Sequence, residues 1–187
     1  MMRFIILHGT QSSPQANWFR WLQGELEQAG HQVIVPQFPT PEGQSLANWL
    51  ETFAQECGEI DAETILIGHS IGATFALRLS EQSRQQAYAA FLVAGFIRKL
   101  DNPEFDPLIE TFVAEPFNWK KIQTNSLYFQ IWSGTDDPYV PVEYAQEIAA
   151  YLGIEPVLVP GGKHLNSAAG YRKFPELLEQ IEILING

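Results

Sequence analysis

Six short apolar runs recur along the chain, each of 3 to 6 residues and each followed by a stretch with a different pattern. The runs are apolar nearly throughout and do not alternate with polar positions, which is typical of strands buried on both faces of a sheet. The predicted strands span residues 3–7, 33–35, 64–67, 88–93, 127–132 and 156–159.

Helical patterns fill the intervals between these runs. In residues 18–29, apolar side chains fall three or four positions apart, and Gly30 is placed to end the helix. Residues 46–53 repeat this spacing after Ser45, a residue type that caps helix N-termini. Three more helices are predicted over 71–79, 142–152 and 174–185.

The alternation of strands and helices indicates an α/β fold with a mainly parallel sheet of about six strands. Right-handed crossovers place helices on both faces of such a sheet, so we expect a three-layer αβα sandwich formed by a single domain over residues 1–187. Sites in these sheets lie beyond the carboxyl ends of the strands. Candidate chemistry is therefore expected in the loops that follow the predicted strands.

One stretch, residues 97–124, interrupts the alternation. It contains three prolines, scattered aromatic residues and no clean strand. Long irregular segments in compact proteins are often lids or binding loops. A surface excursion with one short helix around 108–113 is the other interpretation, and a chain of 187 residues leaves no room for a separate cap domain.

Charge and composition narrow the range of partners. The chain has 11 basic and 22 acidic residues, a net charge of −11, and this field repels phosphate backbones and anionic membranes. We therefore expect neither nucleic acid nor a membrane as a partner. No secretory signal or membrane-spanning run is visible, and the lone Cys57, interpreted as a buried side chain, agrees with a cytoplasmic location. The oligomeric state has no signal in the sequence.

The segment Gly68-His69-Ser70-Ile71-Gly72 joins a predicted buried strand to a predicted helix. In this context G-x-S-x-G is typical of a nucleophile elbow, a sharp turn that exposes the serine hydroxyl at the edge of the sheet. Side chains at positions 68 and 72 would collide across so tight a bend. A glycine-rich turn without catalysis is the other interpretation, but the flanking strand and helix favour Ser70 as a nucleophile.

A serine hydroxyl needs a base to take its proton, and the chain has four histidines. His31 is expected on the surface. His69 lies inside the elbow, where its side chain leaves the turn in a different direction from Ser70, and His8 follows the first strand; we interpret both as structural. His164 lies in a loop that can fold back over the sheet, so it is the predicted base.

A neutral imidazole also needs an acceptor for its second nitrogen. Residues 134–141, Gly-Thr-Asp-Asp-Pro-Tyr-Val-Pro, follow a predicted strand and offer two carboxylates. We favour Asp137, because Pro138 fixes the direction of the loop and the Gly-x-x-Asp-x-x-Val spacing is typical of the acid in such folds. Asp136 remains the alternative, and either residue could instead cap the following helix. The chain order Ser70, Asp137, His164 is that of an α/β-hydrolase.

An oxyanion hole would complete such a site. One donor is expected to be the backbone N–H of Ile71, which follows the nucleophile at a helix N-terminus, where the dipole favours negative charge. The second donor is expected from the loop after the first strand, where Gly9 allows the backbone to turn and Thr10 offers its N–H.

Four segments, LHGTQSSPQANWFRWL, GHSIGA, GTDDPYVP and GGKHLN, together resemble the small α/β-hydrolases of the YdeN and retinoblastoma-binding protein nine family. The likeness covers nearly the whole chain. It implies a minimal α/β-hydrolase fold without a cap domain, with Ser70 as nucleophile, Asp137 as acid and His164 as base. Lys163 departs from the pattern, in which a glycine often precedes the histidine.

Together these patterns predict a serine hydrolase of the esterase type that cleaves small acyl esters or related acyl compounds through an acyl-enzyme. Phe96, Trp119 and Tyr139 are candidates to line its pocket. No metal or other cofactor is expected, because the histidines are scattered and Cys57 stands alone. The alternative is a non-catalytic protein-interaction module on a hydrolase scaffold, since fold does not determine function. A lyase or acyltransferase on the same triad is a third possibility.

Overall fold

The computed structural model describes residues 1–187 and contains one six-stranded sheet, parallel throughout, in the order β2-β1-β3-β4-β5-β6. The strands are β1 (Arg3–Leu7), β2 (Gln32–Ile34), β3 (Thr64–His69), β4 (Ala87–Val93), β5 (Ser126–Gly134) and β6 (Val157–Val159). The strand order reverses between β1 and β3, so the loops after these two strands diverge around a crevice. In open α/β sheets this switch point is where ligands bind.

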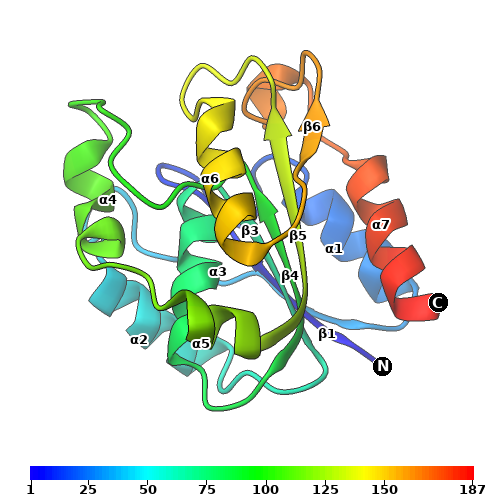
Figure 1. The fold of residues 1–187 in the computed structure, drawn as a ribbon. Coiled ribbons are helices and arrows are strands. Elements are labelled where there is room, and N and C mark those ends of the chain that lie inside the picture. Colours follow the sequence, from blue (N-terminus) through cyan, green and yellow to red (C-terminus); the bar gives the residue numbers. More distant parts are fainter.

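Helices cover both faces of the sheet (Figure 1). One face carries α1 (Phe19–Gln28) and α7 (Pro175–Asn186). The other face carries α2 (Leu46–Glu56), α3 (Ile71–Gln82), α4 (Asp106–Val113), α5 (Trp119–Thr124) and α6 (Val142–Leu152). The predicted three-layer sandwich without a cap domain is thus confirmed. Each of these helices is too short or too polar to cross a membrane.

The apolar runs form strands because their alternate side chains enter two separate cores. In β3 all six residues are buried; Ile65 and Ile67 pack beneath α1 and α7, whereas Leu66 packs on the opposite face. Local capping also follows the sequence, since the Ser45 hydroxyl accepts a hydrogen bond from the Asn48 N–H at the start of α2.

Residues 97–124 form two helices, α4 and α5, where the sequence suggested at most one. The missed helix, α5, has six residues and is too short to show helical periodicity. Arg78 of α3 anchors the segment: its buried guanidinium donates to the carbonyl oxygens of Phe112, at 2.9 Å, and Glu115. The same group lies 3.6 Å from the centre of the Phe117 ring, so the segment is attached to the core of the molecule.

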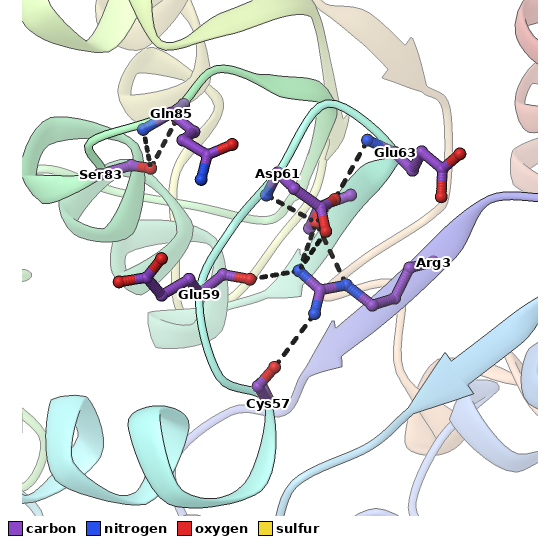
Figure 2. A network of polar contacts seen from close by, with 8 residues as sticks. Arg3, Cys57, Glu59, Asp61, Glu63, Ser83 and Gln85 are labelled. Atoms are coloured by element: carbon purple, nitrogen blue, oxygen red, sulfur yellow. Dashed lines mark hydrogen bonds and ion pairs between the residues drawn. The ribbon is translucent and has the colours of Figure 1, made fainter.

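A second arginine organises the amino ends of the strands, at the edge opposite the crevice. Arg3, the first residue of β1, donates to the carbonyl oxygens of Cys57 and Glu59 and pairs with Asp61 at 3.4 Å (Figure 2). These contacts close the loop between α2 and β3. Cys57 is buried, as predicted, and burial raises the pKa of its thiol to about 12.

Candidate active site

Ser70 lies in the turn between β3 and α3, with φ 57° and ψ −126°. A positive φ is strained for a residue other than glycine, and such strain persists only where the surroundings enforce it. A Cβ on Gly68 would collide with the backbone of Gly72 and Ala73, and one on Gly72 would collide with the Leu7 carbonyl of β1. The two glycines therefore let β1, β3 and α3 pack closely enough to force the turn.

His164 and Asp137 form a buried pair at the carboxyl ends of β5 and β6. Nδ1 of His164 lies 2.7 Å from Oδ2 of Asp137. The other carboxylate oxygen, Oδ1, accepts hydrogen bonds from the backbone N–H groups of Tyr139, at 2.8 Å, and Val140, at 3.0 Å. The carboxylate is thus fixed in orientation, and a proton held on Nδ1 leaves Nε2 of His164 free to act as a base.

Asp136, the alternative acid, has a different partner. Its Oδ1 accepts a hydrogen bond from the backbone N–H of Lys163 at 2.9 Å, and no contact joins it to the His164 ring. The two loops meet closely, because a Cβ on Gly134 would collide with the backbone of Lys163. Lys163 itself has φ 47° and an exposed side chain, which explains why glycine suits this position.

The segment that leads into α1 supports the same histidine loop from the other side. The Trp18 indole N–H donates to the carbonyl of Leu165 at 3.0 Å, and the Asn17 side chain accepts from the Ser167 N–H at 3.0 Å. Residues about 150 positions apart are thereby joined next to His164. Asn17 and Trp18 belong to the segment LHGTQSSPQANWFRWL, and these contacts give them a structural role that the sequence alone did not reveal.

Ser70, His164 and Thr10 line one pocket of about 220 Å³ at the switch point. No hydrogen bond joins Ser70 Oγ to His164 in this conformation. Catalytic hydrogen bonds are often long in unliganded enzymes and shorten when substrate binds. No group of three or more His, Cys, Asp or Glu side chains is arranged to hold a metal ion. The site thus brings together the hydroxyl of Ser70, the imidazole of His164 and the carboxylate of Asp137 at one edge of the sheet.

Gln11 and Asn166 also line this pocket, and its other six lining side chains are apolar. We call it the apolar pocket after these six: Phe96, Leu100, Phe105, Ile109, Tyr139 and Val140. Phe96 and Tyr139 were predicted from the sequence. Trp119, the third candidate, does not line this pocket: it lies at the start of α5 and stacks on Tyr151 with ring centres 4.4 Å apart. Leu100, Phe105 and Ile109 were missed, because which side chains of 97–124 face the site depends on how α4 packs.

Thr10, a predicted oxyanion donor, is held by a residue that the sequence did not mark. The Gln44 amide donates to Oγ1 of Thr10 and to the carbonyl of Leu108, both at 2.9 Å. Gln44 thus links the loop after β1 to α4. The second predicted donor, the N–H of Ile71, is at the first position of α3, where the helix offers no carbonyl partner.

The other histidines are occupied by structural contacts. His8 is fully buried, accepts a hydrogen bond from the Phe38 N–H at 3.0 Å and contacts the Gly9 carbonyl at 2.9 Å. Burial lowers its pKa. His31, expected on the surface, is half-buried and accepts from the Met2 N–H at 3.2 Å.

His69 is buried beneath the elbow, beside the His164 loop. Its Nε2 lies 2.9 Å from the carbonyl oxygen of His164, so this nitrogen carries the proton and donates it. Burial, reinforced by the neighbouring His164, lowers the pKa of His69 to about 3. Its Nδ1 is consequently an acceptor, and it has no hydrogen-bond partner within the protein.

Stability is expected to fall below pH 6.5 because of His69. The folded protein keeps this ring neutral down to a pKa of about 3, whereas the unfolded chain protonates it near 6.5. The unfolded state then binds one more proton, and each pH unit below 6.5 lowers the free energy of unfolding by about 1.4 kcal/mol from this group, until the folded pKa is reached.

Urea denaturation between about pH 7 and pH 5 measures this dependence. The His69→Gln variant keeps a side-chain N–H for the His164 carbonyl but cannot be protonated, so its stability should change less steeply over the same range. In the variant, the pH dependence of the free energy of unfolding that remains would come from His8 and other groups. Equal slopes for the wild type and the variant would contradict the prediction.

The chain is similar in sequence and fold to known proteins. YdeN of Bacillus subtilis (strain 168) is 27% identical over 172 residues, covering 91% of this chain and 89% of YdeN. Serine hydrolase RBBP9 of Rattus norvegicus is 32% identical over 136 residues, covering 72% of this chain and 70% of RBBP9. The crystal structure of the B. subtilis ydeN gene product matches with a TM-score of 0.91 at 25% identity, over 100% of both chains. A family model described as serine hydrolase matches residues 4–182, and the chain therefore belongs to the serine hydrolase family.

Proposed function

We propose that this serine hydrolase cleaves small acyl esters through an acyl-enzyme, with Ser70 as nucleophile, His164 as base and Asp137 as the acid that orients the base. The observation that carries the proposal is the 2.7 Å contact between Asp137 and His164 Nδ1, at the same pocket as Ser70. A strained serine, a free imidazole nitrogen and a fixed carboxylate on three separate loops are the parts that acyl transfer needs.

In the first half of the reaction, Ser70 Oγ attacks the ester carbonyl while its proton moves to Nε2 of His164. The carboxylate of Asp137 stabilises the resulting imidazolium. The N–H groups of Thr10 and Ile71 hold the negative charge that develops on the carbonyl oxygen. When the tetrahedral intermediate collapses, its bond to the alcohol oxygen breaks, and His164 gives the proton to that oxygen.

In the second half, water takes the place of the alcohol. His164 removes a proton from the water as its oxygen attacks the acyl carbon, and the ester bond to Ser70 breaks. The proton returns to Ser70 Oγ, which releases the carboxylic acid and restores the free enzyme. No redox step or additional reactant is needed.

The apolar pocket supports a short acyl chain. Its volume of about 220 Å³ is below the range of roughly 300–1,000 Å³ that is typical of pockets for drug-sized ligands. Of its lining residues, Phe96 is buried, whereas Tyr139 is 45% exposed. We therefore expect acetyl to butyryl esters to be better substrates than decanoyl esters.

A series of p-nitrophenyl esters of increasing acyl length tests this expectation. In the Phe105→Ala variant, removal of a half-buried ring from the wall should shift the preference toward longer acyl chains. The matched control is Tyr151→Ala, which removes an exposed aromatic ring outside the pocket and should leave the chain-length profile unchanged.

A fluorophosphonate probe, which reacts with activated serines, tests the catalytic role itself. The wild-type protein should be labelled, and prior incubation with a p-nitrophenyl ester should slow the labelling. A protein that is neither labelled nor able to cleave any ester of the series would instead be a binding module on a hydrolase scaffold.

A further inference from the structure

A second pocket borders Ser70 and His164 on the side of the β1 loop. Its volume is about 250 Å³, and we call it the polar pocket because its wall is formed largely by polar side chains. They include Gln11, Ser12, Asn17, His69, Asn166 and Ser167. Five residues line both pockets: Thr10, Gln11, Ser70, His164 and Asn166. An ester with its carbonyl at Ser70 can therefore extend one part into each pocket.

The polar pocket suits a neutral group. None of the residues that line it is Asp, Glu, Lys or Arg. His69 adds no charge either, because burial holds its pKa at about 3. An ionic group that entered would lose hydration without gaining an opposite charge, which is costly.

The same wall has unused hydrogen-bonding capacity of both kinds. The side-chain oxygens of Asn17 and Asn166 are occupied by the backbone N–H groups of Ser167 and Ala169, which leaves the amide nitrogens as donors. Ser12 Oγ and His69 Nδ1 are buried without a partner, and His69 is only 3% exposed.

A hydroxyl group both donates and accepts, so it can satisfy donors and acceptors that lie in one wall. Buried polar groups without partners cost free energy, and a ligand that pairs with them recovers part of that cost. A ligand with several hydroxyls therefore matches the polar pocket better than an alkyl group or a group that only accepts.

We propose that the polar pocket binds the alcohol portion of the ester, and that this alcohol is a small neutral polyol such as glycerol. The proposal rests on the proposed function, because it places the acyl chain in the apolar pocket. His164 borders the polar pocket and is therefore positioned to protonate the departing alcohol oxygen. With the opposite orientation of the ester, the unpaired polar groups would face an alkyl chain.

Two esters with the same acyl group test the proposal: glycerol 1-butyrate and n-propyl butyrate. Their alcohols have the same carbon skeleton and differ in two hydroxyls. The wild-type kcat/KM, measured by pH-stat titration of the released acid, should be about tenfold higher for the glycerol ester, the equivalent of one or two net hydrogen bonds. A ratio near one, or a preference for the propyl ester, would overturn the proposal.

Substitutions in the wall of the polar pocket test whether this pocket causes the preference for the glycerol ester. Ser12→Ala removes a hydroxyl that bonds nothing in the protein, and Ser167→Leu replaces another polar group of the wall with a bulky apolar one. Each should lower the ratio of the two kcat/KM values several-fold. Ser13→Ala, in the same loop but outside both pockets, should keep the wild-type ratio. An unchanged ratio in both Ser12→Ala and Ser167→Leu would contradict the assignment.

The outcomes separate the two proposals. If both esters are cleaved at equal rates, the hydrolase function stands and the polyol preference is wrong. If neither ester is cleaved and a fluorophosphonate does not label the protein, the proposed function is wrong, and the polyol preference fails with it.

Discussion

Replacement of Ser70 by alanine is expected to lower kcat for ester hydrolysis by about 10⁶-fold, the loss seen when a triad nucleophile is removed from a serine hydrolase. The reason is that Ser70 supplies the hydroxyl that attacks the ester in the proposed mechanism, so acyl-enzyme formation stops. The remaining activity would come from the oxyanion donors and from substrate binding. The measurement is kcat on p-nitrophenyl butyrate, together with the loss of fluorophosphonate labelling.

The strained backbone at position 70 allows a control for folding. An alanine at position 70 would have the same strained φ of 57°, whereas glycine adopts this conformation readily. The Ser70→Gly variant should therefore be as inactive as Ser70→Ala yet more stable toward heat. Ser83→Ala, at the other end of α3, should retain wild-type activity. Undiminished activity or labelling in Ser70→Ala would remove Ser70 from the mechanism.

The second large effect is expected at Asp137, where substitution by asparagine should lower kcat by up to about 10⁴-fold. The backbone N–H groups of Tyr139 and Val140 bind Oδ1 and would hold the asparagine oxygen in that place. The asparagine NH₂ group would then face Nδ1 of His164. This arrangement moves the imidazole proton to Nε2, which can no longer take a proton from Ser70.

Asp136→Asn is the matched control, because the two carboxylates are adjacent and the substitutions are identical. The asparagine oxygen can still accept from the Lys163 N–H, so kcat should stay within a few-fold of wild type. Values of kcat measured across the pH range for both variants would show whether the loss of activity in Asp137→Asn comes from the changed tautomer of His164. If Asp136→Asn were the more damaging change, the roles given to the two carboxylates would be reversed.

Much of the fold could be predicted from the sequence because burial on both faces leaves a clear apolar signal. β1 has the predicted bounds, and α6 begins and ends as the periodicity indicates. The ends of β3 and β5 were placed too early, because each strand continues into residues that also form a site loop. Polar and glycine residues there resemble turn signals, although Gly68 and His69 pair with β4 and the last two residues of β5 pair with β6.

The candidate site was predictable where its chemistry depends on a local motif. The elbow around Ser70 requires glycines at fixed positions, and these are visible in the sequence. The sequence favoured Asp137 over Asp136 as the acid, but it could not exclude Asp136. The contact of Asp136 with the Lys163 N–H depends on how the loops after β5 and β6 meet. The role of Gln44 could not be predicted for a similar reason, because its hydrogen-bond partners are 34 and 64 positions away in the sequence.

The attachment of residues 97–124 through Arg78 has a consequence for how selectivity can diverge among related hydrolases. The bonds that hold this segment run from a buried guanidinium to backbone carbonyls, which any side chain at those positions retains. Three residues that line the apolar pocket, Leu100, Phe105 and Ile109, belong to the same segment but make none of these bonds. Single substitutions at these three positions can therefore change the substrate range, whereas the contacts between Arg78 and the backbone of the segment stay the same.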